Sequence, residues 1–355
     1  MTPLWKQPVG GGFASFVIAG GRAFTIEQRG VREVAAAYDL ATGRELWTSG
    51  WNALFQENGD GPRATPAWHD GRLYVLGAIG ELRALDAATG RTLWRTNIRA
   101  DAGARNLEFG MSASPLIVDN TVVVLPGGAN GQSVVAYDRG TGTRVWGALD
   151  DGASYSSPVL VTLAGARQIL AFTPTRLVGL APENGTLLWE LPWQTANQAS
   201  QPLVTGADRV FISTATDAAM LQVTAGADGQ LTARELWRTN RMNNNFSSPV
   251  LHDGYIYGLD GSILACIDAS TGDLKWKGGR YGYGQLILAS GYLIVLTEQG
   301  ELALVRADPK AHQEITRFPA IAGTTWNHPA MSDGVLLVRN STEMAAFDLA
   351  ARKGN

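Results

Sequence analysis

A segment of eleven residues that recurs along the chain limits the fold more than any other feature. Each copy has an apolar run, a polar segment with Gly and a closing Trp; the copies lie at 37–47, 84–94, 136–146 and 266–276, with a fifth at 179–189 that lacks the Asp. Two apolar runs around Asp and Gly indicate a β-hairpin, since Gly supplies the positive φ of the turn and Asp bonds its backbone. Trp residues at 47, 94, 146, 189, 237 and 276 are 39 to 52 residues apart. This period is typical of a β-propeller with one four-stranded unit per repeat.

A second marker, a small polar residue followed by Pro, precedes an apolar strand in most repeats. It occurs at Thr65-Pro66, Ser114-Pro115, Ser157-Pro158, Gln201-Pro202 and Ser248-Pro249, with Ser15-Phe16, Gly284-Gln285 and His328-Pro329 in its place elsewhere. Pro is tolerated at the first residue of a strand because no ladder donor is lost there. The markers predict eight repeats, each with strands A to D in order.

The last repeat stops after its third strand at 340–349, whereas Leu4-Trp5-Lys6-Gln7 reads as a fourth strand with no repeat of its own. The sequence therefore predicts an all-β fold: an eight-bladed β-propeller of four-stranded antiparallel blades, closed by the N-terminal strand completing the last blade. Closure removes the open sheet edges of an unclosed array. Since the repeat runs from end to end, residues 1–355 are predicted to form one domain.

Composition excludes several classes of partner. The net charge of −3 and the lack of a Lys/Arg cluster argue against nucleic-acid binding. No apolar run approaches the roughly 18–20 residues of a membrane span. Repeat sequence begins at Met1, so we expect a secretion signal to be absent or removed, and we expect a monomer. Cys266 is the single cysteine, which excludes an internal disulfide and a Cys-based metal site and favours a buried structural thiol.

The candidate site lies at the mouth of the central channel, where the residues just before each strand A converge from eight directions. The predicted ligand-binding residues are Arg63, Glu108, Tyr155, Gln201, Asn245, Tyr283, Trp326, Asn327 and His328. Phe13, Phe109, Asn197, Phe246 and Tyr281 occupy equivalent positions. Hydrogen-bonding groups among apolar faces are typical of a small-molecule or sugar pocket. The alternative is that these are the polar loop ends of any soluble protein.

Among these residues, the candidates for catalysis are Glu108 and His328 as an acid–base pair and Arg63 as a partner for an anion. The sequence has no Gly-x-Ser-x-Gly elbow, no His-x-x-x-His and no phosphate-binding Gly loop. No metal site is predicted, because the recurrent Asp39, Asp86, Asp138, Asp268 and Asp348 belong to the hairpin turns and have a structural role.

The Ala-x-Asp-x-x-Thr-Gly-x-x-x-Trp pattern with Ser-x-Pro upstream resembles the pyrroloquinoline-quinone-like (PQQ-like) propeller repeat. One branch of that family, the quinoprotein alcohol and sugar dehydrogenases, uses PQQ and Ca²⁺ at the channel mouth. Another branch is non-catalytic and includes the lipoprotein B component of the outer-membrane β-barrel assembly machinery. This chain lacks the adjacent cysteines of the dehydrogenases and their large insertions. Only Glu108, Asn245 and Asn327 are positioned to serve as Ca²⁺ ligands.

The resemblance and these departures favour a non-catalytic scaffold, periplasmic or secreted, that binds a protein segment or a small molecule such as a sugar at the channel mouth. Two alternatives remain open at this point. One is a PQQ-dependent oxidoreductase that has lost the usual disulfide. The other is a hydrolase that uses Glu108, His328 and Arg63.

Overall fold

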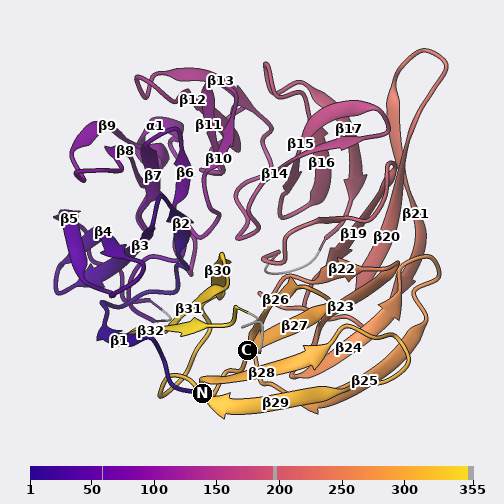
Figure 1. Cartoon of the computed structure of the whole chain (residues 1–355). Coiled ribbons are helices and arrows are strands. Elements are labelled where there is room, and N and C mark those ends of the chain that lie inside the picture. The colour runs from indigo at the N-terminus through magenta and orange to yellow at the C-terminus, as the bar shows by residue number, and fades with distance from the viewer. Residues whose placement is uncertain (58, 195–197, 351–355) are drawn as a thin grey trace.

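The predicted eight-bladed propeller is confirmed. A computed structural model of the chain describes residues 1–57, 59–194 and 198–350. Its strands form eight four-stranded sheets, and every pairing within them is antiparallel. The sheets stand as blades around a central axis (Figure 1).

The blades follow the chain in order, with strands A to D running outward. Blade 1 contains β2 (Val17–Ala19), β3 (Arg22–Arg29), β4 (Arg32–Asp39) and β5 (Glu45–Asn52), and blade 2 contains β6 (Ala67–His69), β7 (Arg72–Leu76), β8 (Glu81–Asp86) and β9 (Thr92–Asn97). The short helix α1 (Ile98–Ala102) leads to blade 3, with β10 (Leu116–Val118), β11 (Thr121–Val124), β12 (Val134–Asp138) and β13 (Arg144–Ala148). Blade 4 contains β14 (Val159–Leu163), β15 (Ala166–Phe172), β16 (Arg176–Leu180) and β17 (Leu187–Pro192).

The second half of the ring repeats this order. Blade 5 contains β18 (Leu203–Val204), β19 (Arg209–Ser213), β20 (Ala218–Ala225) and β21 (Leu231–Thr239), and blade 6 contains β22 (Val250–His252), β23 (Tyr255–Asp260), β24 (Ile263–Asp268) and β25 (Leu274–Arg280). Blade 7 contains β26 (Gln285–Ala289), β27 (Tyr292–Leu296), β28 (Glu301–Arg306) and β29 (Glu314–Pro319). Blade 8 contains β30 (Ala330–Ser332), β31 (Val335–Arg339), β32 (Glu343–Asp348) and, from the N-terminus, β1 (Trp5–Pro8).

The recurrent Asp residues shape the turns between strands C and D. In blade 2, Asp86 Oδ1 accepts hydrogen bonds from the Thr89 hydroxyl at 2.8 Å and from the Thr89 and Ala88 backbone N–H groups at 2.9 and 3.0 Å. These bonds stabilise the carboxylate, the Thr89 hydroxyl most of all, and hold the pKa of Asp86 below its usual range. The Asp side chains therefore define the hairpin turns.

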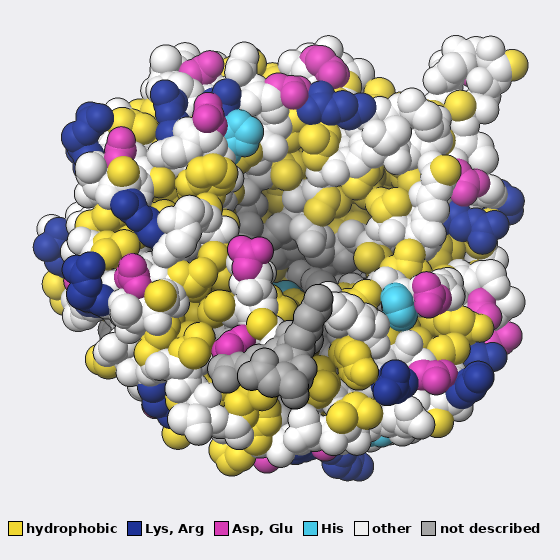
Figure 2. Space-filling view, viewed as in Figure 1, with side chains coloured by type: hydrophobic (Ala, Val, Ile, Leu, Met, Phe, Trp, Pro, Cys, Tyr) yellow, Lys and Arg dark blue, Asp and Glu magenta, His cyan; other side chains and the backbone are white. Residues whose placement is uncertain are grey.

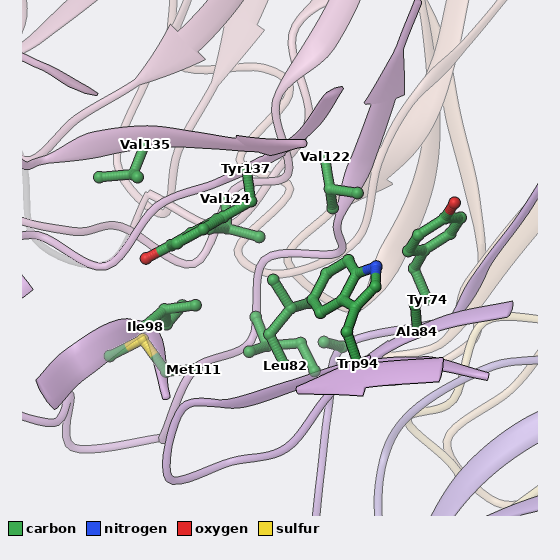
Figure 3. Packing of buried hydrophobic residues seen from close by; sticks show 12 residues of the cluster. Tyr74, Leu82, Ala84, Trp94, Ile98, Met111, Val122, Val124, Val135 and Tyr137 are labelled. Carbon is green, nitrogen blue, oxygen red and sulfur yellow. The ribbon is translucent and has the colours of Figure 1, made fainter. Parts of the chain in front are cut away.

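The repeating Trp residues lie between blades. Trp94 of β9 packs with Tyr74, Leu82 and Ala84 of its own blade against Val122 of blade 3 (Figure 3). Its indole N–H crosses to blade 3 and donates to the carbonyl of Arg139 at 2.9 Å. Equivalent bonds to the next blade are made by Trp5, Trp47, Trp146 and Trp276. The Trp repeat is thus part of the interior, as expected for large aromatic side chains.

The N-terminal strand closes the ring as predicted. β1 pairs with β32 from Trp5↔Ala346 to Pro8↔Glu343, and the Leu4 N–H donates to the Ala346 carbonyl at 2.7 Å. Trp5 is only 8% exposed and donates through its indole N–H to the Leu40 carbonyl of blade 1 at 2.9 Å. The strand that completes blade 8 therefore also holds blade 1.

The segment that follows β1 is fixed by two buried charged residues. The guanidinium of Arg339, in blade 8, donates to the Gly10 carbonyl and to the Thr25 hydroxyl, both at 2.8 Å. The carboxylate of Glu27, in blade 1, accepts from the Gly10 N–H. A Cβ on Gly10 would lie 2.6 Å from the Gln28 carbonyl oxygen, so this position has no room for a side chain. Backbone contacts thus add to the Trp5 packing at the closing seam.

Two blades depart from the repeat. In blade 7 the segment 307–313 connects β28 and β29, and Trp276 of blade 6 donates to the Asp308 carbonyl at 2.8 Å while its ring meets the His312 ring edge-on. In blade 5 the β20–β21 hairpin is longer than the others and extends beyond them (Figure 1).

Cys266 is buried in β24, and its burial raises the pKa of the thiol to about 12, which fits a structural thiol.

A buried carboxyl group lies between blades 1 and 2. Glu33 of β4 accepts a hydrogen bond from the Ala78 N–H at 2.7 Å and another from the Trp51 indole at 2.9 Å. Its side chain is inaccessible to water, and this burial raises the pKa of Glu33 to about 7 although both hydrogen bonds oppose the shift. The folded protein therefore binds a proton at Glu33 more tightly than the unfolded chain does.

We expect this group to make the free energy of unfolding fall as the pH rises from about 4.5 to about 7. The contribution is fully present below the lower value and is lost above the higher one. Its size is about 3 kcal/mol, because one pKa unit corresponds to about 1.4 kcal/mol. Urea unfolding at pH 5 and pH 8 checks this. The free energy of unfolding should change less between the two pH values in Glu33→Gln than in the parent protein. The exposed control Glu183→Gln should change as much as the parent protein does. Equal pH dependence in all three proteins would contradict the assignment.

Candidate functional site at the channel mouth

Aromatic side chains from four separate connections meet at the channel mouth. Trp326 lies 5.6 Å from Phe13 and 6.0 Å from Phe246 between ring centroids, and Phe246 lies 5.8 Å from Tyr283. These residues precede strands A of blades 8, 1, 6 and 7 respectively. Tyr283, Phe246, Trp326 and Phe13 thus form one continuous row, which we call the mouth arc.

One carboxylate positions two members of the mouth arc. Glu298, in the turn between β27 and β28, accepts from the Trp326 indole N–H at 2.9 Å and from the Tyr283 backbone N–H at 3.3 Å. Sequence reasoning missed Glu298 because it considered only the residues ahead of each strand A. The turns between strands B and C lie on the same face of the ring as the connections ahead of strands A. An acidic residue in such a turn could therefore have been predicted as part of the site.

Arg63 continues the arc toward blade 2. Its guanidinium lies 4.9 Å from the Phe13 ring and 5.1 Å from the Phe55 ring, and it donates to the Gly61 carbonyl at 3.1 Å and the Gly59 carbonyl at 3.3 Å. Burial lowers the pKa of Arg63 to about 10, so the group stays charged at neutral pH. The connection wraps around this side chain and fixes it beside Phe13.

Glu108 and Tyr155 lie on the same side of the mouth as Arg63. The Tyr155 ring meets Phe109 edge-on at 5.5 Å. Burial is the main cause that raises the pKa of Tyr155; the negative charge of Glu108 adds to the shift and the positive charge of Arg63 opposes it. These electrostatic effects place Glu108, Tyr155 and Arg63 in one neighbourhood.

His328 has different surroundings from those of Glu108. Its Nδ1 lies 2.9 Å from the Pro329 carbonyl, and burial lowers the pKa of the imidazole, with opposing effects from backbone hydrogen bonds. Glu108 is exposed and acts on Tyr155 instead. The structure therefore offers no hydrogen bond or charge effect that links Glu108 and His328 as an acid–base pair within the described residues.

Several polar side chains around the mouth bond to the protein itself. Asn327 donates to the Gly12 and Ala14 carbonyls at 3.1 and 3.0 Å, which ties blade 8 to blade 1. Asn244 donates to the Leu259 carbonyl and Gln198 to the Pro174 carbonyl, each at 3.0 Å. Gln201 and Asn245 are partly exposed, and Asn197 lies outside the described residues.

Tyr281 does not join the mouth arc. It is fully buried, and its hydroxyl lies 2.8 Å from His312 Nε2 and donates to Glu314 Oε2 at 2.7 Å. Both partners lie at or beside β29, the outer strand of blade 7. The Tyr281-x-Tyr283 pair thus divides into one interior side chain and one side chain at the mouth.

The residues at the mouth do not fit the Ca²⁺ of the dehydrogenase branch. Asn327 is held between two backbone carbonyls, while Glu108 is on the connection ahead of blade 3 and Asn245 on the one ahead of blade 6. Among the described residues, no three His, Cys, Asp or Glu side chains form a group able to hold a metal ion. No helix in the described ranges is long and apolar enough to cross a membrane.

Figure 2 shows one face of the ring, on the side of the two chain ends. That face is hollowed at its centre, hydrophobic side chains border the hollow, and Lys and Arg side chains lie mainly toward the perimeter. The innermost strands supply partly exposed apolar residues, among them Ile18, Ile117, Leu251 and Met331. The ring therefore presents apolar surface near its axis and charge near its rim.

Comparison with known proteins places the chain in a family. The family model described as outer membrane protein assembly factor BamB matches residues 31–278 and 194–316. BamB of Moranella endobia is 24% identical over 68% of this chain and 64% of its own length, and BamB of Xanthomonas campestris is 24% identical over 86% of each. The match thus spans less than two thirds of the first of these relatives.

Solved structures and dehydrogenases add to this comparison. The crystal structure of BamB from Moraxella catarrhalis has a TM-score of 0.71 at 15% identity and covers 100% of this chain and 99% of that one, which supports the fold. The quinohemoprotein alcohol dehydrogenase ADH-IIG of Pseudomonas putida is 29% identical over only 38% of this chain and 19% of its own length. The resemblance to the non-catalytic branch is confirmed, and the dehydrogenases are the more distant relatives. The chain belongs to the family of the outer membrane protein assembly factor BamB, a family of PQQ-like β-propellers.

Proposed function

We propose that this protein is a non-catalytic scaffold of the periplasm that docks a protein partner on its channel-mouth face during outer membrane protein assembly. Outer membrane protein assembly is proposed because the relatives are named for it. The mouth arc is proposed as the docking surface. The scaffold has no need of a cofactor.

The single observation that carries the proposal is the mouth arc itself. Phe246 and Tyr283 are 42% and 44% exposed, although each is held in contact with a neighbouring ring. Exposed apolar side chains that lie together on a rigid surface are typical of a protein-interaction site. Four separate connections contribute to this one row, so it is a product of the folded ring.

Site-specific photo-crosslinking in the cell envelope tests the proposal. A photoreactive aromatic residue at Phe246 should give adducts with a component of the outer membrane assembly machinery. The same residue at Leu274, which is 40% exposed on the outer strand β25, should not give these adducts. Phe246→Ser with Tyr283→Ser should abolish co-purification of that component and leave the melting temperature unchanged within about 2 °C, because exposed substitutions cost little stability. Equal adducts at both positions, or retained co-purification, would contradict docking at the mouth.

The dehydrogenase alternative has a direct test. A thermal-shift titration with PQQ, with and without Ca²⁺, should leave the melting temperature unchanged. A ligand at a hundred times its Kd stabilises by about 2.7 kcal/mol, which moves the midpoint by a few degrees. A Ca²⁺-dependent rise would support the oxidoreductase in place of the scaffold.

A further inference from the structure

We infer that the segment bound at the channel mouth is an extended peptide with apolar side chains at one end and Lys or Arg at the other. The inference rests on the proposed function and specifies the chemistry of its partner. It comes from two neighbouring parts of the mouth: the mouth arc offers exposed aromatic rings, and the connections ahead of blades 2 and 3 carry exposed carboxylates.

The aromatic side is the part of the mouth arc that lies ahead of blades 6, 7 and 8. The ring planes of Phe246 and Tyr283 are inclined by 36° and those of Phe246 and Trp326 by 67°. The row is therefore a stepped apolar surface that suits successive side chains of an extended peptide. Glu298 holds Trp326 and the backbone of Tyr283, which prepares the surface before binding.

The acidic side lies on the connections ahead of blades 2 and 3. Glu57, Asp60 and Glu108 are exposed there. The described parts of 54–66 and the segment 104–112 contain one exposed cation, Arg105. Arg63 is partly buried under Phe13 and Phe55. Carboxylates beside an apolar row favour a ligand that carries positive charge next to its apolar residues.

The two sides are physically joined. A Cβ on Gly59 would lie 2.8 Å from the Phe13 ring, and one on Gly11 would lie 3.5 Å from Asp60 Cβ. The segment that carries Glu57 and Asp60 thus lies against the Phe13 end of the mouth arc. A single extended peptide can contact both sides.

The amides at the mouth favour a peptide over a sugar. Sugar recognition needs polar side chains that are available to the ligand's hydroxyl groups. Asn327, Asn244 and Gln198 instead donate to backbone carbonyls of the protein. Three of the amides at the mouth are therefore held by the protein itself, and Gln201 and Asn245 are partly exposed to a ligand.

Fluorescence anisotropy with synthetic labelled peptides tests the inference. The first probe has Phe and Leu in one half and Lys in the other, its twin carries Glu in place of Lys, and an oligomer of N-acetylglucosamine is the sugar probe. We expect the basic probe to bind at least about tenfold more tightly than its acidic twin at low salt, a difference of about 1.4 kcal/mol. The sugar should not compete with it.

Variants separate the two sides of the mouth. Phe246→Ser with Tyr283→Ser should weaken the basic probe at every salt concentration. Glu57→Gln with Asp60→Asn and Glu108→Gln should weaken it at low salt and reduce the salt dependence, because exposed charges are screened by salt. The matched controls are Leu274→Ser and Glu183→Gln, which should bind like the parent protein. Both residues are exposed and lie outside the connections that form the mouth.

Each outcome decides between explanations. Equal binding of the two peptides, or binding of the sugar in their place, overturns the inference. If adducts at Phe246 persist while the peptides are not distinguished, the inference fails and docking at the mouth stands. If adducts at Phe246 are absent, the proposed function fails as well.

Discussion

Deletion of residues 1–9 is expected to open the ring and to remove more than about 5 kcal/mol of stability, which is comparable to the whole stability of many domains. The deletion removes the four-residue pairing of β1 with β32 and leaves a sheet edge uncovered. It also removes Trp5, whose packing joins blade 8 to blade 1. An ordinary exposed terminus would make no such contribution.

Thermal unfolding followed by circular dichroism checks this result. The shortened chain should lose its cooperative transition or melt lower by about 10 °C or more. Deletion of residues 1–3 is the matched control, because the first backbone bond to blade 8 is donated by Leu4. If both deletions leave the melting temperature unchanged, the closing-strand explanation is wrong.

Trp94→Ala is expected to cost about 3–5 kcal/mol, as truncations of buried aromatic residues do. Trp94 is 8% exposed, donates to the Arg139 carbonyl of the next blade and lies 6.1 Å from the Tyr74 ring. Its ring also covers Gly142, where a Cβ would lie 2.6 Å from the indole and where the backbone φ of +75° favours glycine. The substitution leaves a cavity between two blades and removes one of the three hydrogen bonds that the Arg139 carbonyl accepts.

Trp68 provides the control within the same blade. It lies on the inner strand β6 and is 41% exposed. Trp68→Ala should therefore cost less than about 1 kcal/mol in urea unfolding. Similar costs for the two substitutions would show that the repeating Trp residues are not the source of stability between blades.

The order of strands was predictable from sequence because the signals are local. The Asp86 turn is formed by bonds to Ala88 and Thr89, within three residues of the Asp. The strand starts after Pro66 and Pro115 depend on the same short range. Closure by Leu4–Gln7 followed from counting strands, since a fourth strand was missing at one end of the chain and present at the other. That residues 1–355 form one domain stays a prediction.

The site was predictable only in part. The sequence indicated that Arg63, Tyr283 and Trp326 lie on converging connections, because the repeat fixes where each connection falls. It did not indicate that Trp326 contacts both Phe13 and Phe246, or that Glu298 holds its indole. It also treated Tyr281 and Tyr283 alike, although one is buried against His312 and the other is 44% exposed.

By itself the sequence determined the repeat, the turns, the number of blades and the way the ring closes, since each depends on the spacing of neighbouring residues. Only the tertiary structure decided which side chains meet at the mouth and which polar groups are used internally. Phe13 and Trp326 are separated by most of the chain, and their contact depends on the curvature of the closed ring. Hydrogen bonds such as Asn327 to Gly12 depend on the same closure, because they join the two ends of the chain.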